Sequence, residues 1–247
     1  MNYQVKSHDL WTEYNSKQHP LLPLLKKLVG RMEPLTIAAA GAGGKTTLLL
    51  HLAEECAKQN TSVLVTTTTH MLLPEDQLGI PAAAGEITWL GTPAVPVFRK
   101  NGWIKCQAPS PKALELSRSN HALTLIEADG SRMLPLKIPD CREPVIADRT
   151  DLLLVVYGLS ALGQPLSRVC HHPELLPASC RGSDCVTPDL MGTLMREYYL
   201  DPMAEKYPGM RLIPVWNQAD TPKRICAAKA AARCCGREFQ LITSFLS

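Results

Sequence analysis

The sequence has no apolar run that approaches the length of a membrane-spanning helix, and its first residues lack the apolar core of a secretory signal. It also lacks a strong charge imbalance, because 26 basic and 23 acidic residues give a formal net charge of +3. That excess is too small to predict binding of nucleic acid or of an anionic membrane. We therefore expect a cytoplasmic protein whose partners include neither nucleic acid nor a membrane.

The nine cysteines form no C-x-x-C pair. Their irregular spacing predicts neither a zinc ribbon nor a thioredoxin-like redox site, and in the cytoplasm we expect them to stay reduced. Cys170 precedes the adjacent histidines His171 and His172, which leaves a metal site as an alternative. Side chains of neighbouring residues diverge on most backbones, so this spacing alone does not define such a site.

Hydrophobic residues make up 45% of the 247 residues, enough for the core of one α/β domain with insertions, or of two small domains. Apolar runs alternate with helical patterns, which predicts a mostly parallel sheet with helices on both faces. Ligands of such sheets bind at the carboxyl edge of the strands. We expect strands near 35–40, 62–66, 122–126, 151–157, 210–216 and 238–245, and helices near 46–58, after 110, at 187–200 and at 222–235.

The chain divides into an N-terminal helical extension, residues 1–33, and a nucleotide-binding domain, residues 34–247. An apolar stripe between Leu21 and Val29 predicts that the extension packs on the core, and contact with a partner or a second subunit is the alternative. The domain carries an insertion at about 74–109. There Asn101-Gly102 lies between two apolar runs, which predicts a small β-hairpin.

The stretch from Thr36 to Leu50 reads T-I-A-A-A-G-A-G-G-K-T-T-L-L-L, the order of a strand, a phosphate loop and a helix. It fits the pattern G-x-x-x-x-G-K-[ST] except that Ala39 occupies the first glycine position. Glycines let backbone N–H groups approach an anion, and the start of the helix adds its positive dipole end. We therefore predict a P-loop NTPase-like fold and assign nucleotide binding to Gly41, Ala42, Gly43, Gly44, Lys45, Thr46 and Thr47.

Lys45 is expected to reach the β- and γ-phosphates, and the Thr46 hydroxyl to ligate Mg²⁺. The strand at 122–126 ends in Glu127-Ala128-Asp129-Gly130, and carboxylates in that place hold Mg²⁺ or orient the attacking water. The sequence does not decide which acid takes the metal, so Glu127 and Asp129 are both candidate ligands.

Four threonines, Thr66–Thr69, follow the second strand and run into His70. Thr68 and Thr69, together with Asp129, are candidate contacts to the γ-phosphate or to water. Threonine is also a common strand residue, so a purely structural role is the alternative. A role of His70 in catalysis or phosphate sensing stays open.

The segment Asn217-Gln218-Ala219-Asp220 resembles the guanine motif N-K-x-D, with Gln in place of Lys. In that motif the Asp accepts hydrogen bonds from guanine and the Asn braces the phosphate loop. Thr243-Ser244 stands where guanine-binding folds place a base-contacting loop. We therefore expect Asn217 and Asp220 to contact a GTP molecule, with ATP as the alternative nucleotide and the motif then an ordinary polar turn.

Three signatures occur together: G-A-G-G-K-T-T, T-T-T-T-H-M, and E-A-D-G-S-R followed by P-L-K-I-P and E-P-V-I. Over roughly residues 34–220 the chain resembles the YqeC family, accessory proteins of selenium-dependent molybdenum hydroxylases. That resemblance implies a maturation factor whose partner is such an enzyme or its maturation machinery. His172 departs from the pattern, because the family is expected to have Arg there.

The E-x-x-G spacing from Glu127 to Gly130 also looks like that of nucleotide-dependent metallochaperones that load nickel into hydrogenase and urease. Those proteins close as dimers around nucleotide, and the analogy at the level of the fold implies a homodimer.

These features predict a Mg²⁺-dependent nucleoside triphosphatase, slow without its partner, whose hydrolysis step drives maturation of a client enzyme. A kinase is one alternative, with Lys137, Arg142 and the histidines lining the acceptor site. The loop that carries Lys137, Arg142 and Glu143 is either such a substrate or partner loop or an ordinary solvated one. A non-catalytic module that binds nucleotide as a structural ligand is the other alternative.

Overall fold

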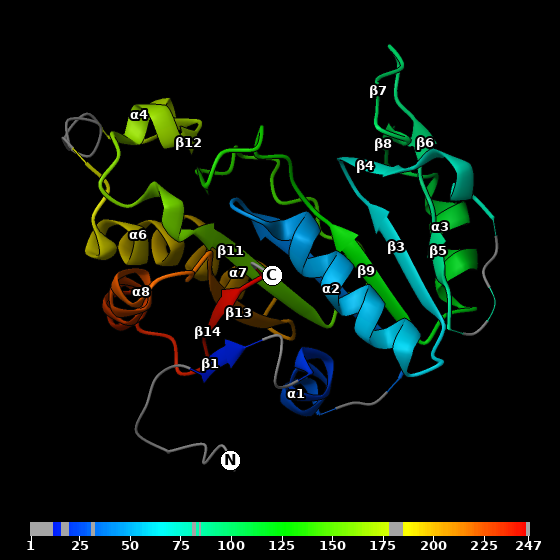
Figure 1. Cartoon of the computed structure of the whole chain (residues 1–247), viewed down its shortest axis with the longest axis horizontal. Coiled ribbons are helices and arrows are strands. Elements are labelled where there is room, and N and C mark those ends of the chain that lie inside the picture. Colours follow the sequence, from blue (N-terminus) through cyan, green and yellow to red (C-terminus); the bar gives the residue numbers. More distant parts are fainter. Residues whose placement is uncertain are drawn as a thin grey trace.

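The computed structural model describes residues 12–15, 20–30, 33–80, 83, 85–177 and 185–245. Its centre is an eight-stranded sheet with the order β1-β14-β13-β11-β2-β9-β3-β5, in which every neighbouring pair is parallel. This is the expected α/β architecture, with helices on both faces of a mostly parallel sheet (Figure 1). The strands are β1 (Thr12–Asn15), β2 (Leu35–Gly41), β3 (Val63–Thr67), β5 (Ile87–Trp89), β9 (Leu123–Glu127), β11 (Leu152–Gly158), β13 (Arg211–Asn217) and β14 (Leu241–Ser244).

Four strands of the sheet, β2, β3, β9 and β11, consist of buried residues along their whole length, as expected where helices cover both faces of a parallel sheet. Alternate residues of β2 therefore enter two different cores. Ala38 and Ala40 pack on one face with α6 (Pro188–Met195) and α8 (Pro222–Cys235). Ile37 and Ala39 pack on the other face with α1 (Leu21–Val29) and α2 (Lys45–Lys58).

Side-chain caps fix where three helices begin. Ser110, Thr187 and Thr221 each accept a hydrogen bond from a backbone N–H in the first turn, and each precedes a proline. The helix predicted at 187–200 is longer than expected, because α6 continues through a π-helical turn, η4 (Arg196–Leu200), into α7 (Asp201–Lys206). The remaining helical segments are α3 (Pro111–Arg118), α4 (Leu166–Val169), η1 (Glu75–Gln77), η2 (Leu159–Ala161) and η3 (Pro173–Leu175).

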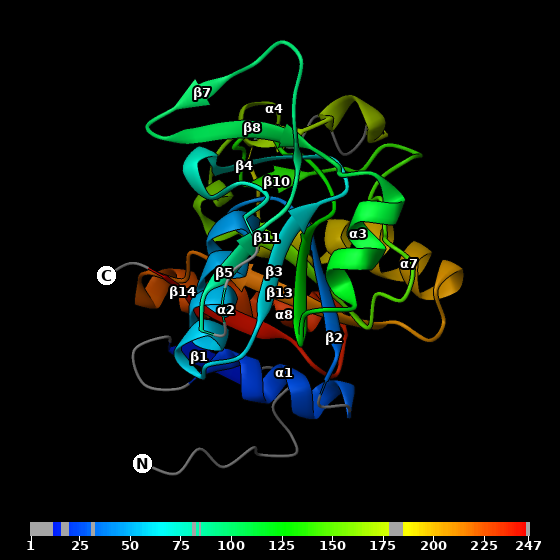
Figure 2. The same cartoon turned by 90° about the vertical axis from the view of Figure 1, so that its right-hand side faces the viewer.

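The predicted hairpin is part of a larger antiparallel sheet that stands at the carboxyl edge of the main sheet (Figure 2). It contains β4 (His70–Pro74), β6 (Thr92–Pro93), β7 (Arg99–Lys100) and β8 (Trp103–Gln107). Asn101 and Gly102 turn between β7 and β8 with positive φ values of 51° and 78°, which confirms the Asn-Gly turn. β8 pairs with β4 on one side and with β6 and β7 on the other, so β4 belongs to the same small sheet as the hairpin.

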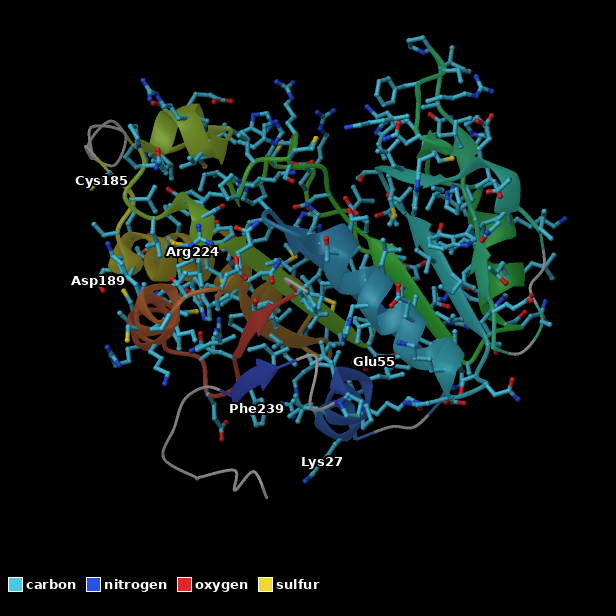
Figure 3. All side chains as sticks on the ribbon, viewed as in Figure 1. Lys27, Glu55, Cys185, Asp189, Arg224 and Phe239 are labelled. Atoms are coloured by element: carbon cyan, nitrogen blue, oxygen red, sulfur yellow. The ribbon has the colours of Figure 1, made fainter. Side chains whose placement is uncertain are left out.

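In the N-terminal extension, α1 packs on the core, with Leu21, Leu22 and Leu25 fully buried. The Glu55 carboxylate of α2 accepts hydrogen bonds from the backbone N–H groups of Leu21 (2.9 Å) and Leu22 (2.8 Å), so it caps α1 (Figure 3). Besides α1, the described part of this extension contains an edge strand that was not predicted, because β1 pairs with β14. Its sequence T-E-Y-N carries no apolar alternation that would identify a strand. Residues 1–11, 16–19 and 31–32 lie outside the described residues.

A second small sheet was also unpredicted. The short strands β10 (Leu136–Lys137) and β12 (Cys170–His171) pair in parallel and form a two-stranded sheet of their own. None of the described helices has both the length and the apolar character needed to cross a membrane.

Gly192 is required where α6 crosses α8. A Cβ atom there would collide with the carbonyl oxygen of Ala231 and approach the Cβ of Cys234 to 2.8 Å. We expect overpacking in Gly192→Ala to cost about 1–3 kcal/mol of the free energy of unfolding. Alanine is also a better helix former than glycine, by about 1 kcal/mol, but this gain is expected to be smaller than the overpacking cost. Urea denaturation measures the change. The control is Gly209→Ala, where a Cβ meets no atom within 4 Å, and equal stability losses in both variants would contradict the packing.

Candidate functional site

A cavity of about 1240 Å³ opens at the carboxyl edge of the main sheet. It lies where the carboxyl ends of parallel strands meet, which is the usual ligand position in such sheets. Its walls come from the start of α2, the ends of β3 and β9, the insertion and the segment after β9 (Figure 1). Of the site residues predicted from the sequence, eight line this cavity: Gly43, Gly44, Lys45, Thr46, Thr47, Thr68, Thr69 and Glu127.

The glycine-rich loop between β2 and α2 packs tightly on the ends of β11 and β13. Gly43 and Gly44 have φ values of 81° and 118°, and a Cβ on either would collide with the Gly158 backbone or the Asn217 amide. Asn217 Nδ2 donates a hydrogen bond to the carbonyl oxygen of Gly43 at 2.9 Å. Asn217 at the end of β13 therefore contacts the glycine-rich loop, as the Asn of the guanine motif is expected to do. Gly41 and Ala42 support the loop but do not line the cavity.

Lys45 is folded back onto its own loop. Its Nζ donates to the carbonyl oxygen of Gly41 at 2.6 Å and lies 3.1 Å from Asp129 Oδ1. Only 3% of the residue is exposed, although it still lines the cavity. The positive charge of Lys45 therefore lies beside the glycine-rich loop, and the buried Asp129 carboxylate is its partner.

Asp129 is fully buried behind the loop and does not line the cavity. Its Oδ2 accepts hydrogen bonds from the backbone N–H of Gly41 (2.9 Å) and from Tyr199 Oη (2.8 Å). A second lysine, Lys137, places its Nζ 3.5 Å from Asp129 and 2.7 Å from Glu143. Metal binding or water activation by Asp129 stays a prediction, and it would require some of these contacts to break.

Sequence reasoning missed two members of this network. Lys137 was expected either in a substrate or partner loop or in an ordinary solvated loop, yet its side chain has no exposed surface and its Nζ also donates to the Gly130 carbonyl oxygen. Tyr199 comes from the π-helical turn η4, a type of irregularity that is frequent at functional sites. Burial raises the pKa of Tyr199 well above its usual value, so its hydroxyl stays a hydrogen-bond donor.

Thr46 and Glu127 form a pair at the wall of the cavity. Thr46 Oγ1 donates to Glu127 Oε2 at 2.6 Å, and Glu127 is 7% exposed. Burial raises the pKa of the Glu127 carboxyl above its ordinary value of 4.5, against the opposing effects of Lys45 and the Thr46 hydrogen bond. A hydroxyl and a carboxylate at this separation are the hard oxygen donors that suit Mg²⁺. Of the two candidate metal ligands, Glu127 and Asp129, Glu127 is thus the one that lines the cavity.

The four threonines differ in what their hydroxyls contact. Thr66 Oγ1 bonds to Leu90, Thr67 Oγ1 to Glu127, and Thr68 Oγ1 to Val145, in each case to a carbonyl oxygen. Within the described parts of the chain, Thr69 Oγ1 is buried without a partner, and it lines the cavity. Leaving a buried hydroxyl unpaired costs about 1–3 kcal/mol. Thr69 therefore fits the predicted contact to phosphate or water, which stays a prediction.

The predicted base-binding residues are joined to one another rather than open to the cavity. Thr243 Oγ1 donates to Asn217 Oδ1 at 2.8 Å, and Ser244 Oγ donates to Asp220 Oδ1 at 2.6 Å. The other oxygen of Asp220 lies 3.1 Å from the guanidinium of Arg224. Asp220 does not line the cavity, and a guanine base would have to displace Arg224 from it.

His70 and His171 line the cavity, and His172 does not. The His171 ring lies 3.8 Å from that of His172, between ring centroids, and burial lowers the pKa of His171. Its two ring nitrogens are buried and have no hydrogen-bond partner among the described residues.

The metal alternative at Cys170-His171-His172 finds no support. Among the described residues, no group of three or more His, Cys, Asp or Glu side chains is placed to hold a metal ion. The described cysteines are all free thiols, and Cys180 lies outside the described residues.

A second cavity, of about 800 Å³, lies at the opposite edge of the sheet. The arginines that line it contact other parts of the protein. Arg118 donates to the carbonyl oxygen of Asp148, Arg211 to that of Leu28, and Arg149 pairs with Glu115. These arginines are therefore engaged in contacts within the protein. We take the cavity at the carboxyl edge as the candidate site.

The chain therefore has a parallel α/β sheet with a glycine-rich loop before α2 and an acid, Glu127, beside that loop at the carboxyl edge. The family model described as YqeC protein matches residues 37–174, which is more than half of the chain, and the chain belongs to the YqeC family. A curated relative from Escherichia coli (strain K12), named "Uncharacterized protein YqeC", is 37% identical over 153 residues. The match covers 58% of this chain and 59% of that relative's length. No solved structure matches the chain.

The Asp129 carboxylate is the buried anion that balances the charges of Lys45 and Lys137. Asp129→Asn keeps the shape but leaves Lys45 without an anion, and breaking a buried ion pair in this way costs about 3–5 kcal/mol. We expect a loss of that order in the free energy of unfolding, measured by urea denaturation. The control Glu75→Gln removes a surface pair with Arg99 and should cost at most about 1 kcal/mol. Similar small losses in both variants would show that Asp129 does not carry the buried charge.

Proposed function

We propose that this YqeC-family protein binds a nucleoside triphosphate together with Mg²⁺ and hydrolyses it, as a P-loop NTPase. The observation that supports this most is the arrangement at one edge of the cavity. The braced glycine loop, the Lys45 ammonium and the Thr46–Glu127 pair converge there. Loop N–H groups and the positive end of α2 favour an anion, and Lys45 adds a full charge.

The residues present fit the metal that this function needs. Thr46 and Glu127 would hold Mg²⁺ in place of their mutual hydrogen bond, because both are oxygen donors facing the cavity. When bound, Mg²⁺ supplies neutralisation of the charge that develops on the transferred phosphate. Thr69 lines the cavity, its hydroxyl has no partner among the described residues, and it would contact the γ-phosphate or the attacking water.

Lys45 must exchange the Gly41 carbonyl oxygen for a phosphate oxygen. Asp129 would keep three contacts after that exchange, to Gly41, Tyr199 and Lys137. Its role in this proposal is therefore to hold Lys45 and the loop.

GTP is the favoured nucleotide in this proposal, with ATP the alternative. Asn217 contacts the loop and Thr243, and Asp220 contacts Ser244, so the end of β13 and the end of β14 form one connected unit. In this proposal the Asp220 carboxylate would accept hydrogen bonds from the base in place of Arg224. Hydrogen bonds to a charged acceptor discriminate between bases by about 1.5–3 kcal/mol.

The wider role follows from the family resemblance alone. We propose a cytoplasmic accessory factor that uses hydrolysis to drive maturation of a selenium-dependent molybdenum hydroxylase, working as a homodimer or with that client. A kinase would use the same phosphate loop, and a non-catalytic module would bind without turnover. Product analysis separates them, since free phosphate indicates hydrolysis and a phosphorylated compound indicates transfer.

Calorimetric titration with GTP and with ATP, each with Mg²⁺, tests nucleotide binding and base preference together. We expect Lys45→Ala to weaken both nucleotides by about 10- to 100-fold, because a charged hydrogen bond to phosphate is lost. Asp220→Ala should weaken GTP by a similar factor and leave ATP unchanged.

Normal nucleotide binding by folded Lys45→Ala protein would contradict the phosphate-loop assignment. An unchanged affinity for GTP in Asp220→Ala would instead show that the segment 217–220 is a polar turn and not a base-binding site. Thermal denaturation of each variant checks that a weaker affinity does not reflect unfolding.

The pH dependence of Mg²⁺ binding tests Glu127. Because its pKa is raised above 4.5, the carboxyl keeps its proton to higher pH than usual, and Mg²⁺ affinity should fall as pH falls through that raised pKa. Lys45 and the Thr46 hydroxyl oppose the rise, and Asp129 adds to it. Mg²⁺ titration of the GTP-bound protein at a series of pH values above 4.5 should show this decline. In Glu127→Gln, binding should be weaker and should keep only the pH dependence of the nucleotide's own phosphate. The same pH profile as wild type would exclude Glu127 as the ligand.

A further inference from the structure

The cavity is larger than a single small ligand needs. Ligand pockets usually measure about 300–1,000 Å³, and this one reaches about 1240 Å³. The proposed nucleotide phosphates account for the end at the start of α2. We call the rest the outer part of the cavity; it lies between the insertion and the segment after β9, and its lining includes Leu72, Phe98, Lys105, Arg132, Met133 and His171.

Two cations face the outer part without a fixed partner. Lys105 comes from β8 and Arg132 from the segment after β9, and neither has an ion-pair partner among the described residues. The acids nearby are already engaged, since Asp140 pairs with Arg142 and Glu143 with Lys137. The outer part therefore carries an excess of positive charge that a ligand anion would neutralise.

Apolar side chains stand beside these cations. Phe98 is 50% exposed and Met133 is 93% exposed, and both line the cavity. Leu72 adds to the same lining. Exposed apolar side chains next to cations that have no ion-pair partner among the described residues match a ligand with an apolar body and an anionic group.

The backbone around this cavity is strained. Arg132, Met133, His172 and Gln218 have φ values of 50°, 63°, 62° and 64°, and they are four of the seven described non-glycine residues with positive φ. Three of the four line the cavity, and His172 adjoins the lining residue His171. Such conformations cluster at ligand-binding sites, because the surrounding structure must hold them.

The His171 imidazole supplies a polar group that makes no hydrogen bond within the described residues. Its position is fixed by the β10–β12 pairing, in which Lys137 is opposite His171, and by the stacking on His172. A neutral imidazole has one donor and one acceptor nitrogen, and both nitrogens here are buried without a protein partner among the described residues. A hydrogen-bonding group on a ligand in the cavity would satisfy them.

We propose that the outer part of the cavity is a second ligand site, which binds a small organic anion with an apolar body beside the nucleotide. Lys105 and Arg132 bind the anionic group, Phe98 and Met133 contact the apolar body, and His171 hydrogen-bonds a polar group of the ligand. This goes beyond the proposed function and rests on it only for the view that nucleotide phosphates occupy the other end.

The probe for this site is 8-anilinonaphthalene-1-sulfonate, an apolar anion whose fluorescence reports binding. We expect the full-length protein to bind about one probe molecule per chain, with GTP and Mg²⁺ present or absent. In Lys105→Gln/Arg132→Gln the dissociation constant should rise about tenfold. The control Lys100→Gln/Arg168→Gln removes the same charge from exposed positions outside the cavity and should leave the constant unchanged.

Equal affinity in wild type and the Lys105/Arg132 variant, or an equal loss in both double variants, would overturn the second site. Displacement of the probe by GTP would also overturn it, because the probe would then occupy the phosphate end. The Lys45→Ala protein separates the two hypotheses. Loss of nucleotide binding with the probe still bound supports the second site, and retained nucleotide binding with no dependence on Lys105 and Arg132 refutes both.

Discussion

The buried carboxylate of Asp129 is the constraint on which the candidate site depends. Two lysines, Lys45 and Lys137, approach it in a part of the protein that excludes solvent, and buried charges are tolerated only with partners. Asp129 also accepts a hydrogen bond from Gly41, so the same carboxylate fixes the start of the glycine loop. Tyr199 adds a contact from the far side. The loop is therefore held by β9, the segment after it and the π-helical turn η4 together, and not by its own sequence alone.

Local sequence signals predicted most of the fold because the physics behind them is local. Central strands are apolar on both faces, and Asn101-Gly102 adopts the positive φ values that a tight hairpin needs. The helices that begin after Ser110, Thr187 and Thr221 start where the sequence predicts them. The bracing role of Asn217 was also predictable, since a polar residue at the end of a strand beside β11 reaches the loop between β2 and α2.

Other features depend on residues that meet only in the folded chain. Lys137 reads as a solvated lysine in a proline-rich loop, and nothing near it in sequence indicates Asp129 as a partner. Tyr199 points to Asp129 because η4 departs from α-helical geometry, and no residue pattern indicated that departure. β1 has no apolar alternation, and its pairing with β14 joins opposite ends of the chain. For the same reason the sequence left Glu127 and Asp129 equivalent, whereas their burial and contacts place only Glu127 in the cavity wall.

In the proposed function, ligands at the two ends of the nucleotide site replace internal partners. Lys45 gives up the Gly41 carbonyl oxygen for phosphate, and Asp129 then still has Lys137 opposite it, so no buried charge is left unpaired. Asp220 gives up Arg224 for the base, and Ser244 keeps the carboxylate oriented during the exchange. Breaking each internal contact costs free energy, and this cost reduces the net free energy of binding. Affinity at both ends is therefore set by the difference between the ligand contact and the internal contact that it replaces.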